Sequence, residues 1–480
     1  MDSSVRSLLL HGVAWNFMEK ILMRGFSFVI GIILARLLTP SDFGLIGMLT
    51  IFISVSNVFI EGGFAKALIQ KQNCQEIDFA TAFITNVVVS IIIYVILYIC
   101  APWISEFFNE PILTDLTRVL SINFVLGSFN VVQRAKLMAN VDFKSLAQIN
   151  VISTIISGAL GIYMAYRGLG VWALAFQQIA STIIYLFIFP FYSHWKPSIM
   201  FSKESFNELF SFGSKLVATG FVSVIMNNVS VMCIGKFYRS GQLGYYTRSL
   251  QFSDIIAITV NEVLGSVTFP VLSKLQDNRA YLTIVYKKSL FFTALIIFPI
   301  MILCALLSRP LVLILLTEKW LPCVVLMQWL FVTRIIYPLS AINLNLLNAL
   351  GRSDLFMKVD FSKIPMNLLA LAITIPLGVK AIVIGLFCTS YIAFFLNSYY
   401  PGKLIGYGAL QQIIDWKYII ISTCIMSMVV ISYMHLVSNV WLQLIGGGII
   451  GFAVYVLCCF FFKIIDKDLL QIIKKRIYNG

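Results

Sequence analysis

Charged residues are scarce in this sequence. Only 12% of its 480 residues are Asp, Glu, Lys or Arg, whereas about a quarter of a soluble domain is charged. Apolar residues make up 59%, and the mean hydropathy is +0.91. Long polar stretches are lacking too, because the connections between apolar segments run to only about 15 residues. No connection can hold a separate soluble domain, so the sequence predicts a polytopic membrane protein.

Groups that carry enzyme or metal chemistry are also few. The nine cysteines are odd in number, lie mostly in apolar segments and form no CxxC motif, and the three histidines are far apart. We therefore expect no disulfide framework, no metal site and no cofactor. The sequence has no glycine-rich phosphate loop and no nucleophile elbow, so it does not predict an enzyme. It also lacks a small-residue cleavage site near its start, which predicts that the first apolar segment is retained.

Hydrophobic runs predict about fourteen membrane spans, since one span needs about 20 mostly apolar residues. The predicted spans are 11–38, 41–63, 79–102, 112–133, 145–166, 170–192, 208–235, 243–272, 287–308, 322–348, 356–377, 379–400, 417–437 and 440–462. Connections, tails and the adjoining span ends on one side carry 21 Lys and Arg, against 6 on the other. The positive-inside rule then places both termini in the cytoplasm. The net charge of +14 thus follows topology and does not indicate nucleic-acid binding.

Two short internal matches predict that the first twelve spans form two similar halves. Shifted by 200 residues, 33–46 falls on 233–246, so that Gly44 aligns with Gly244; GVWALA falls on GVKAIV at a shift of 208. An even number of spans gives both halves the same orientation, so we expect a pseudo-two-fold axis along the membrane normal, with substrate between the halves. The expected domains are a six-helix bundle at 1–192, a cytoplasmic linker at 193–207, a second six-helix bundle at 208–400, and two extra helices with an amphipathic tail at 401–480.

The few cationic residues predicted at membrane depth are the first functional candidates. A Lys or Arg near the centre of a span costs roughly 2.5–3.5 kcal/mol on insertion scales, so such a residue must face protein or water. Lys20 and Arg24 are four residues apart and share one face of the first span, while Lys215 lies in the corresponding span of the second half. Arg248 and Arg334 are further candidates. Cations on the leading helices of both halves suggest a cavity that receives an anionic headgroup.

Three acidic residues are candidates for proton or sodium coupling: Glu19, Asp254 and Glu262. Asp254 and Glu262 are eight apart and share a face of the eighth predicted span. A structural role is equally open, because charges within a membrane often pair and hold helices together. Glu19 could neutralise either of the two cations that follow it, and Asp360 could neutralise Lys363.

Seven segments follow one another along the chain: LARLLTPSDFGLIGM, GGFAKALIQKQ, GVWALAFQQ, ELFSFGSKL, FPVLSKLQ, EKWLP and ALGRSD. In this order they resemble the signatures of Wzx-type lipopolysaccharide and exopolysaccharide flippases, and the resemblance covers nearly the whole chain. These flippases form the polysaccharide-transporter branch of the multidrug/oligosaccharidyl-lipid/polysaccharide superfamily. The resemblance implies an all-α, V-shaped membrane protein of two six-helix bundles plus two extra helices.

The same resemblance implies that the protein moves an undecaprenyl-pyrophosphate-linked oligosaccharide across the bacterial inner membrane during surface polysaccharide assembly. It also implies a basic cavity, and the positions that fit are Lys20, Arg24, Lys215, Arg248 and Arg334. The expected partners are the lipid-linked oligosaccharide, membrane lipids and a coupling ion, either a proton or sodium.

Two other classes of membrane protein are alternatives to a flippase. A drug or metabolite cation antiporter of the same superfamily would prefer a cavity lined by carboxylates, whereas the leading helices here are net basic. A membrane-embedded polysaccharide polymerase or glycosyltransferase would need a sizeable catalytic loop, and no connection is long enough to supply one.

Overall fold

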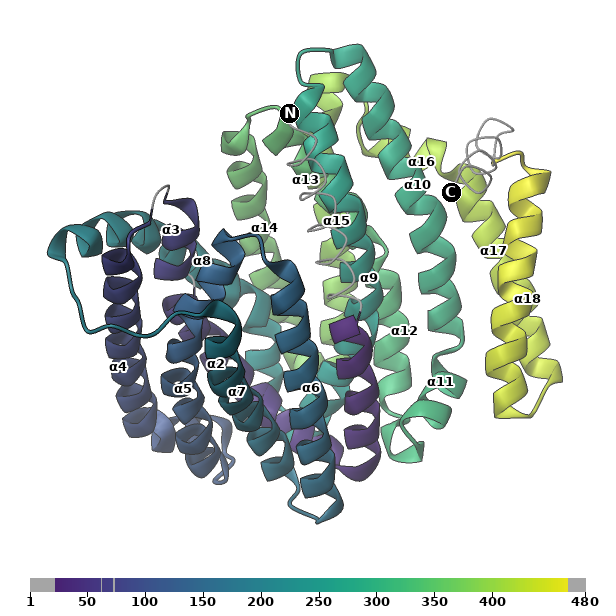
Figure 1. Cartoon of the computed structure of the whole chain (residues 1–480). Coiled ribbons are helices and arrows are strands. Elements are labelled where there is room, and N and C mark those ends of the chain that lie inside the picture. Colours follow the sequence, from purple (N-terminus) through teal and green to yellow (C-terminus); the bar gives the residue numbers. More distant parts are fainter. Residues whose placement is uncertain (1–21, 62, 72–73, 465–480) are drawn as a thin grey trace. The chain divides into compact units, whose positions relative to one another are not determined.

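The computed structural model describes residues 22–61, 63–71 and 74–464 and contains no strand among them (Figure 1). Residues 22–37 are helical. The elements that follow are α2 (Pro40–Glu61), α3 (Phe64–Gln70), α4 (Glu76–Phe108), α5 (Leu113–Ala139), α6 (Phe143–Tyr166), α7 (Val171–Ser193), α8 (Lys203–Phe237), α9 (Ser240–Lys274), α10 (Arg279–Leu306), α11 (Ser308–Leu315), η1 (Glu318–Trp320), α12 (Cys323–Arg334), α13 (Ile336–Ala349), α14 (Ser353–Thr374), η2 (Ile375–Leu377), α15 (Val379–Ile405), α16 (Ala409–Asp415), α17 (Lys417–Leu436) and α18 (Val440–Phe461).

Twelve helical segments in the described ranges are long and apolar enough to cross a membrane. Each corresponds to one of the fourteen predicted spans. The predicted span 11–38 begins outside the described residues, and 112–133 corresponds to α5, which is not among the twelve. Polar residues along this helix, among them Arg118, Asn123 and Asn130, make it less apolar than the twelve. The prediction of an all-α integral membrane protein is confirmed, but the count of fourteen spans is not.

The chain divides into two compact units, and the boundary between them falls inside α9, between Thr247 and Arg248. In the first unit α4 packs on α5, α5 and α6 pack on α7, and α8 lies along α2. In the second unit α13 and α14 pack on α15, α10 contacts α12 and α17, and α17 pairs with α18 as a hairpin (Figure 1). Helix α8 therefore groups with the helices that precede it.

Two helix starts in the first unit meet in a reciprocal contact. A Cβ atom on Gly44 of α2 would lie 1.7 Å from the carbonyl oxygen of Ser240, and one on Gly244 of α9 would lie 1.8 Å from the carbonyl oxygen of Pro40. Only glycine allows two backbones this close. The hydroxyls of Ser41 and Ser240 are 2.6 Å apart in the same contact. Positions 200 residues apart exchange roles, as a local two-fold axis requires.

The segment between α7 and α8 is tied to the start of α4. Trp195 is almost fully buried, and its Nε1 donates to Glu76 Oε2 at 2.9 Å. Lys71 Nζ donates to Glu208 Oε2 at 2.7 Å and to Asp78 Oδ1 at 3.0 Å. The hydrogen bond to Glu208, with help from Asp78, raises the pKa of Lys71. These contacts hold the linker and the start of α8 close to the start of α4.

A fully buried polar network joins three helices of the second unit. Tyr286 on α10 donates its hydroxyl to Asn343 Oδ1 on α13, and Gln412 Nε2 on α16 donates to the same oxygen at 2.9 Å. Asn343 Nδ2 donates in return to Gln412 Oε1 at 3.3 Å. Buried polar groups of this kind are costly unless they are paired, so the network fixes how these helices meet.

Candidate functional site

Two candidate cations of the first unit, Arg24 and Lys215, lie on the helical segment 22–37 and on α8. Lys20 and Glu19 are outside the described residues. Arg24 is half-buried in the helical segment 22–37. Lys215 is exposed on α8, twelve residues after Lys203, which is about 18 Å along the helix axis.

Arg248 is enclosed by protein. Only 5% of it is exposed, and its Nη1 donates to Gln251 Oε1 within α9. The next residue, Ser249, donates its hydroxyl to the carbonyl oxygen of Cys323 on α12 at 3.2 Å. The guanidinium therefore lies against a helix contact and does not project into open space.

Arg334 and Asp254 form an ion pair. The Nε of Arg334, at the end of α12, lies 2.5 Å from Asp254 Oδ1 on α9, and about a quarter of each side chain is exposed. A candidate cavity cation and a candidate coupling carboxylate are thus brought together. The pairing of Asp360 with Lys363 is confirmed, with 2.7 Å between the carboxylate and the ammonium.

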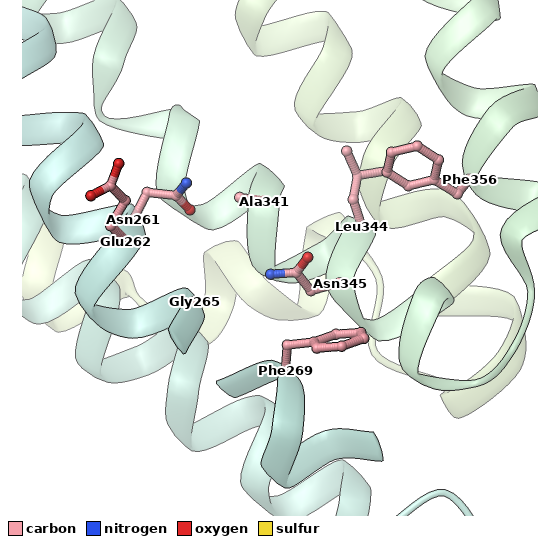
Figure 2. A pocket seen from close by; sticks show the side chains of 8 residues that line it. All are labelled: Asn261, Glu262, Gly265, Phe269, Ala341, Leu344, Asn345 and Phe356. Atoms are coloured by element: carbon pink, nitrogen blue, oxygen red, sulfur yellow. The ribbon is translucent and has the colours of Figure 1, made fainter. Parts of the chain in front are cut away.

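Glu262 lines a pocket of about 380 Å³ in the second unit (Figure 2). The other lining residues are Asn261, Gly265 and Phe269 of α9, Ala341, Leu344 and Asn345 of α13, and Phe356 of α14. Sequence reasoning singled out only Glu262 because it alone carries a charge. The regular spacing of 261, 265 and 269 on one face of α9 was the signal that could have revealed the rest.

The matched family is the decisive comparison with known proteins. Residues 33–325 match the polysaccharide biosynthesis protein family. The chain belongs to this family. The matched stretch contains most of the segments that carry the Wzx-type resemblance, and that resemblance is confirmed.

Three curated relatives are similar over most of their length. The lipopolysaccharide biosynthesis protein WzxC of Escherichia coli (strain K12) is 22% identical over 75% of this chain and 74% of its own. The teichuronic acid biosynthesis protein TuaB of Bacillus subtilis (strain 168) is 24% identical over 73% of each chain. The succinoglycan biosynthesis transport protein ExoT of Rhizobium meliloti (strain 1021) is 21% identical over 64% of this chain and 62% of its own.

Solved structures with the same fold include a flippase and a transporter. The lipid II flippase MurJ in an inward closed conformation superposes with a TM-score of 0.74 at 15% identity, over 95% of this chain and 99% of its own. An inward-facing multidrug resistance MATE transporter of the MOP superfamily gives a TM-score of 0.62 at 15% identity, over 80% and 96%. This multi-pass membrane protein of the polysaccharide biosynthesis family therefore has the fold that MurJ and MATE transporters share.

Proposed function

We propose that the protein translocates an undecaprenyl-pyrophosphate-linked oligosaccharide from the inner to the outer leaflet of a bacterial inner membrane. The observation that carries this proposal is the family match over residues 33–325. It is supported by relatives named for the biosynthesis of lipopolysaccharide, teichuronic acid and succinoglycan. The MurJ-like fold over 95% of the chain supports a transporter and not an enzyme.

In the proposed mechanism the polyprenyl tail stays in lipid while the pyrophosphate enters a water-filled cavity. Arg24 pairs bidentately with phosphate oxygens, and Lys20 and Lys215 contribute point charges. Exposure of Lys215 and partial exposure of Arg24 support a role in contacting a soluble headgroup. Alternating access then presents the cavity to the outer side.

Arg334 and Arg248 take a secondary part in this proposal because Arg334 is paired with a carboxylate and Arg248 is almost fully buried. A pyrophosphate that reaches Arg334 competes with Asp254, which links headgroup binding to the charge state of a carboxylate. Asp254 remains the proposed group for proton or sodium coupling, and Glu262 is proposed for proton coupling.

The test is complementation of a strain that lacks this gene. We expect Arg24→Ala to abolish most surface polysaccharide export while the protein stays in the membrane, because losing a charged hydrogen-bond pair weakens headgroup binding by about 10- to 150-fold. Lipid-linked oligosaccharide should accumulate inside the cell. The control is Arg167→Ala, an exposed arginine in the turn between α6 and α7. Normal export by the Arg24→Ala variant would remove Arg24 from the site.

A drug or metabolite cation antiporter is the second candidate, and the likeness to a MATE transporter favours it. The same deletion strain separates the two. Loss of surface polysaccharide with unchanged sensitivity to cationic drugs supports the flippase, whereas intact polysaccharide with raised drug sensitivity supports the antiporter.

A further inference from the structure

We infer that the pocket between α9, α13 and α14 is a glycan subsite, which binds a hydroxyl-rich sugar ring of the cargo by hydrogen bonds and by contact with aromatic faces. This inference rests on the proposed transport of a lipid-linked glycan and goes further, since it separates sugar recognition from the cations proposed for the pyrophosphate. Its residues lie wholly within the second unit.

The pocket is built from one face of each helix. Positions 261, 265 and 269 are four residues apart on α9, and 341 and 345 are four apart on α13, so each set forms a single stripe. Gly265 and Ala341 are small and leave the space between the stripes open. Figure 2 shows the side chains of Asn261 and Phe269 on α9 and that of Asn345 on α13, all of which line the pocket.

Two carboxamides line the pocket, those of Asn261 and Asn345. Neither makes a side-chain hydrogen bond in the described part of the chain. A carboxamide is both a donor and an acceptor, and so is a sugar hydroxyl. The Glu262 side chain lines the same pocket and adds a carboxylate to it. The two carboxamides therefore match the edge of a sugar ring and need water or a ligand to satisfy them.

The apolar walls complete the match. Phe269 is 41% exposed and Phe356 is half-buried, so both rings have surface left for a ligand. Ligand sites combine such apolar surface with a few convergent polar groups, and they fall in the range of about 300–1,000 Å³ that includes this pocket. The C–H face of a sugar ring is apolar and fits against an aromatic ring, while its hydroxyl edge is polar.

Charge and size argue against other occupants. The eight described lining residues include a carboxylate but no Lys, Arg or His, so the pocket does not favour a phosphate group. A bound cation needs oxygen ligands at about 2.0–2.6 Å and little more room than the ion itself. At about 380 Å³, the pocket has the volume of roughly 12 water molecules, which is far more than an ion requires.

The test measures thermal unfolding of the purified full-length protein with three probes. They are the oligosaccharide released by mild acid from the host's lipid-linked pool, inorganic pyrophosphate, and sodium chloride in place of choline chloride. We expect the oligosaccharide to stabilise the wild type and to bind about 3- to 10-fold more weakly to Asn345→Ala and Phe269→Ala, the loss expected for one hydrogen bond or ring contact. Stabilisation by pyrophosphate should be unchanged in both variants.

Two matched controls keep the test specific. Asn348→Ala removes a carboxamide of α13 that does not line the pocket, and Val271→Ala shortens an exposed side chain of α9 two residues from Phe269. Both should bind the oligosaccharide like the wild type. Equal binding by all four variants, or stabilisation by sodium alone that Asn345→Ala removes, would overturn the glycan subsite.

Export in cells separates this inference from the proposed function. If the deletion strain loses surface polysaccharide but Asn345→Ala and Phe269→Ala restore it fully at normal protein levels, the subsite is wrong and the flippase proposal stands. If the deletion strain exports normally and the oligosaccharide does not stabilise the wild type, both proposals fail.

Discussion

Replacing Gly44 by alanine tests the reciprocal contact between the starts of α2 and α9. The added Cβ would lie 1.7 Å from the Ser240 carbonyl oxygen, whereas real Cβ atoms essentially never approach closer than 3.0 Å, so the two helix starts must separate by about 1.3 Å. Overpacking of this kind costs roughly 1–3 kcal/mol. The upper end applies because the obstacle is backbone and not a flexible side chain.

Alanine also favours the helix by about 1 kcal/mol relative to glycine, which offsets part of the clash. We therefore expect Gly44→Ala to lower the free energy of unfolding by about 2 kcal/mol. Gly244→Ala should have a similar effect, since its Cβ would lie 1.8 Å from the Pro40 carbonyl oxygen. Thermal unfolding in detergent and the amount of protein in the membrane measure both.

The double variant makes the test sharper. Once one alanine has separated the helix starts, the second meets little further resistance, so Gly44→Ala with Gly244→Ala should be clearly less destabilising than the sum of the two single changes. The control is Gly241→Ala, because a Cβ there meets nothing within 4 Å. If Gly44→Ala is as stable as the control, or if the two effects simply add, the reciprocal contact is wrong.

Two further changes test buried polar contacts of the second unit. Asn343→Leu removes a hydrogen-bond partner of the Tyr286 hydroxyl and of the Gln412 carboxamide in a fully buried site. We therefore expect the free energy of unfolding to fall by about 2–4 kcal/mol, measured by thermal unfolding. An unchanged unfolding temperature would contradict the network. Asp254→Asn weakens the ion pair with Arg334. A double-mutant cycle with Arg334→Gln should give a coupling free energy of about 1–3 kcal/mol between the two residues. A coupling near zero would show that the pair is not formed in the membrane.

The spans were predictable because hydropathy is a local property of the chain. Helix α5 marks the limit of that reasoning, since its polar residues are visible in the sequence but their partners are not. Asn130 Nδ2 donates to the carbonyl oxygen of Thr182, and Gln133 Oε1 accepts from the Ser193 hydroxyl, so α7 supplies partners for two polar residues of α5. Because these partners are more than 50 residues apart in the sequence, no local sequence pattern predicts the contacts.

The internal repeat shows a similar division. Aligning Gly44 with Gly244 identified two positions that share a role, but the alignment could not say that each glycine packs against the partner turn. Likewise the charges of Arg334 and Asp254 were visible, while their pairing across 80 residues was not. The sequence identified the charged residues that are costly to bury, and the structure shows which of them form ion pairs.

Uncharged polar residues are the hardest to assign, and α13 shows why. Asn343 and Asn345 are identical side chains two positions apart, which places them about 200° apart around the helix. Asn343 is fully buried and held by Tyr286 and Gln412, whereas Asn345 lines the pocket and has no partner in the described chain. Their substitutions should therefore separate by readout: a change at Asn343 lowers stability, and a change at Asn345 lowers oligosaccharide binding in a protein that unfolds at the wild-type temperature when no ligand is present.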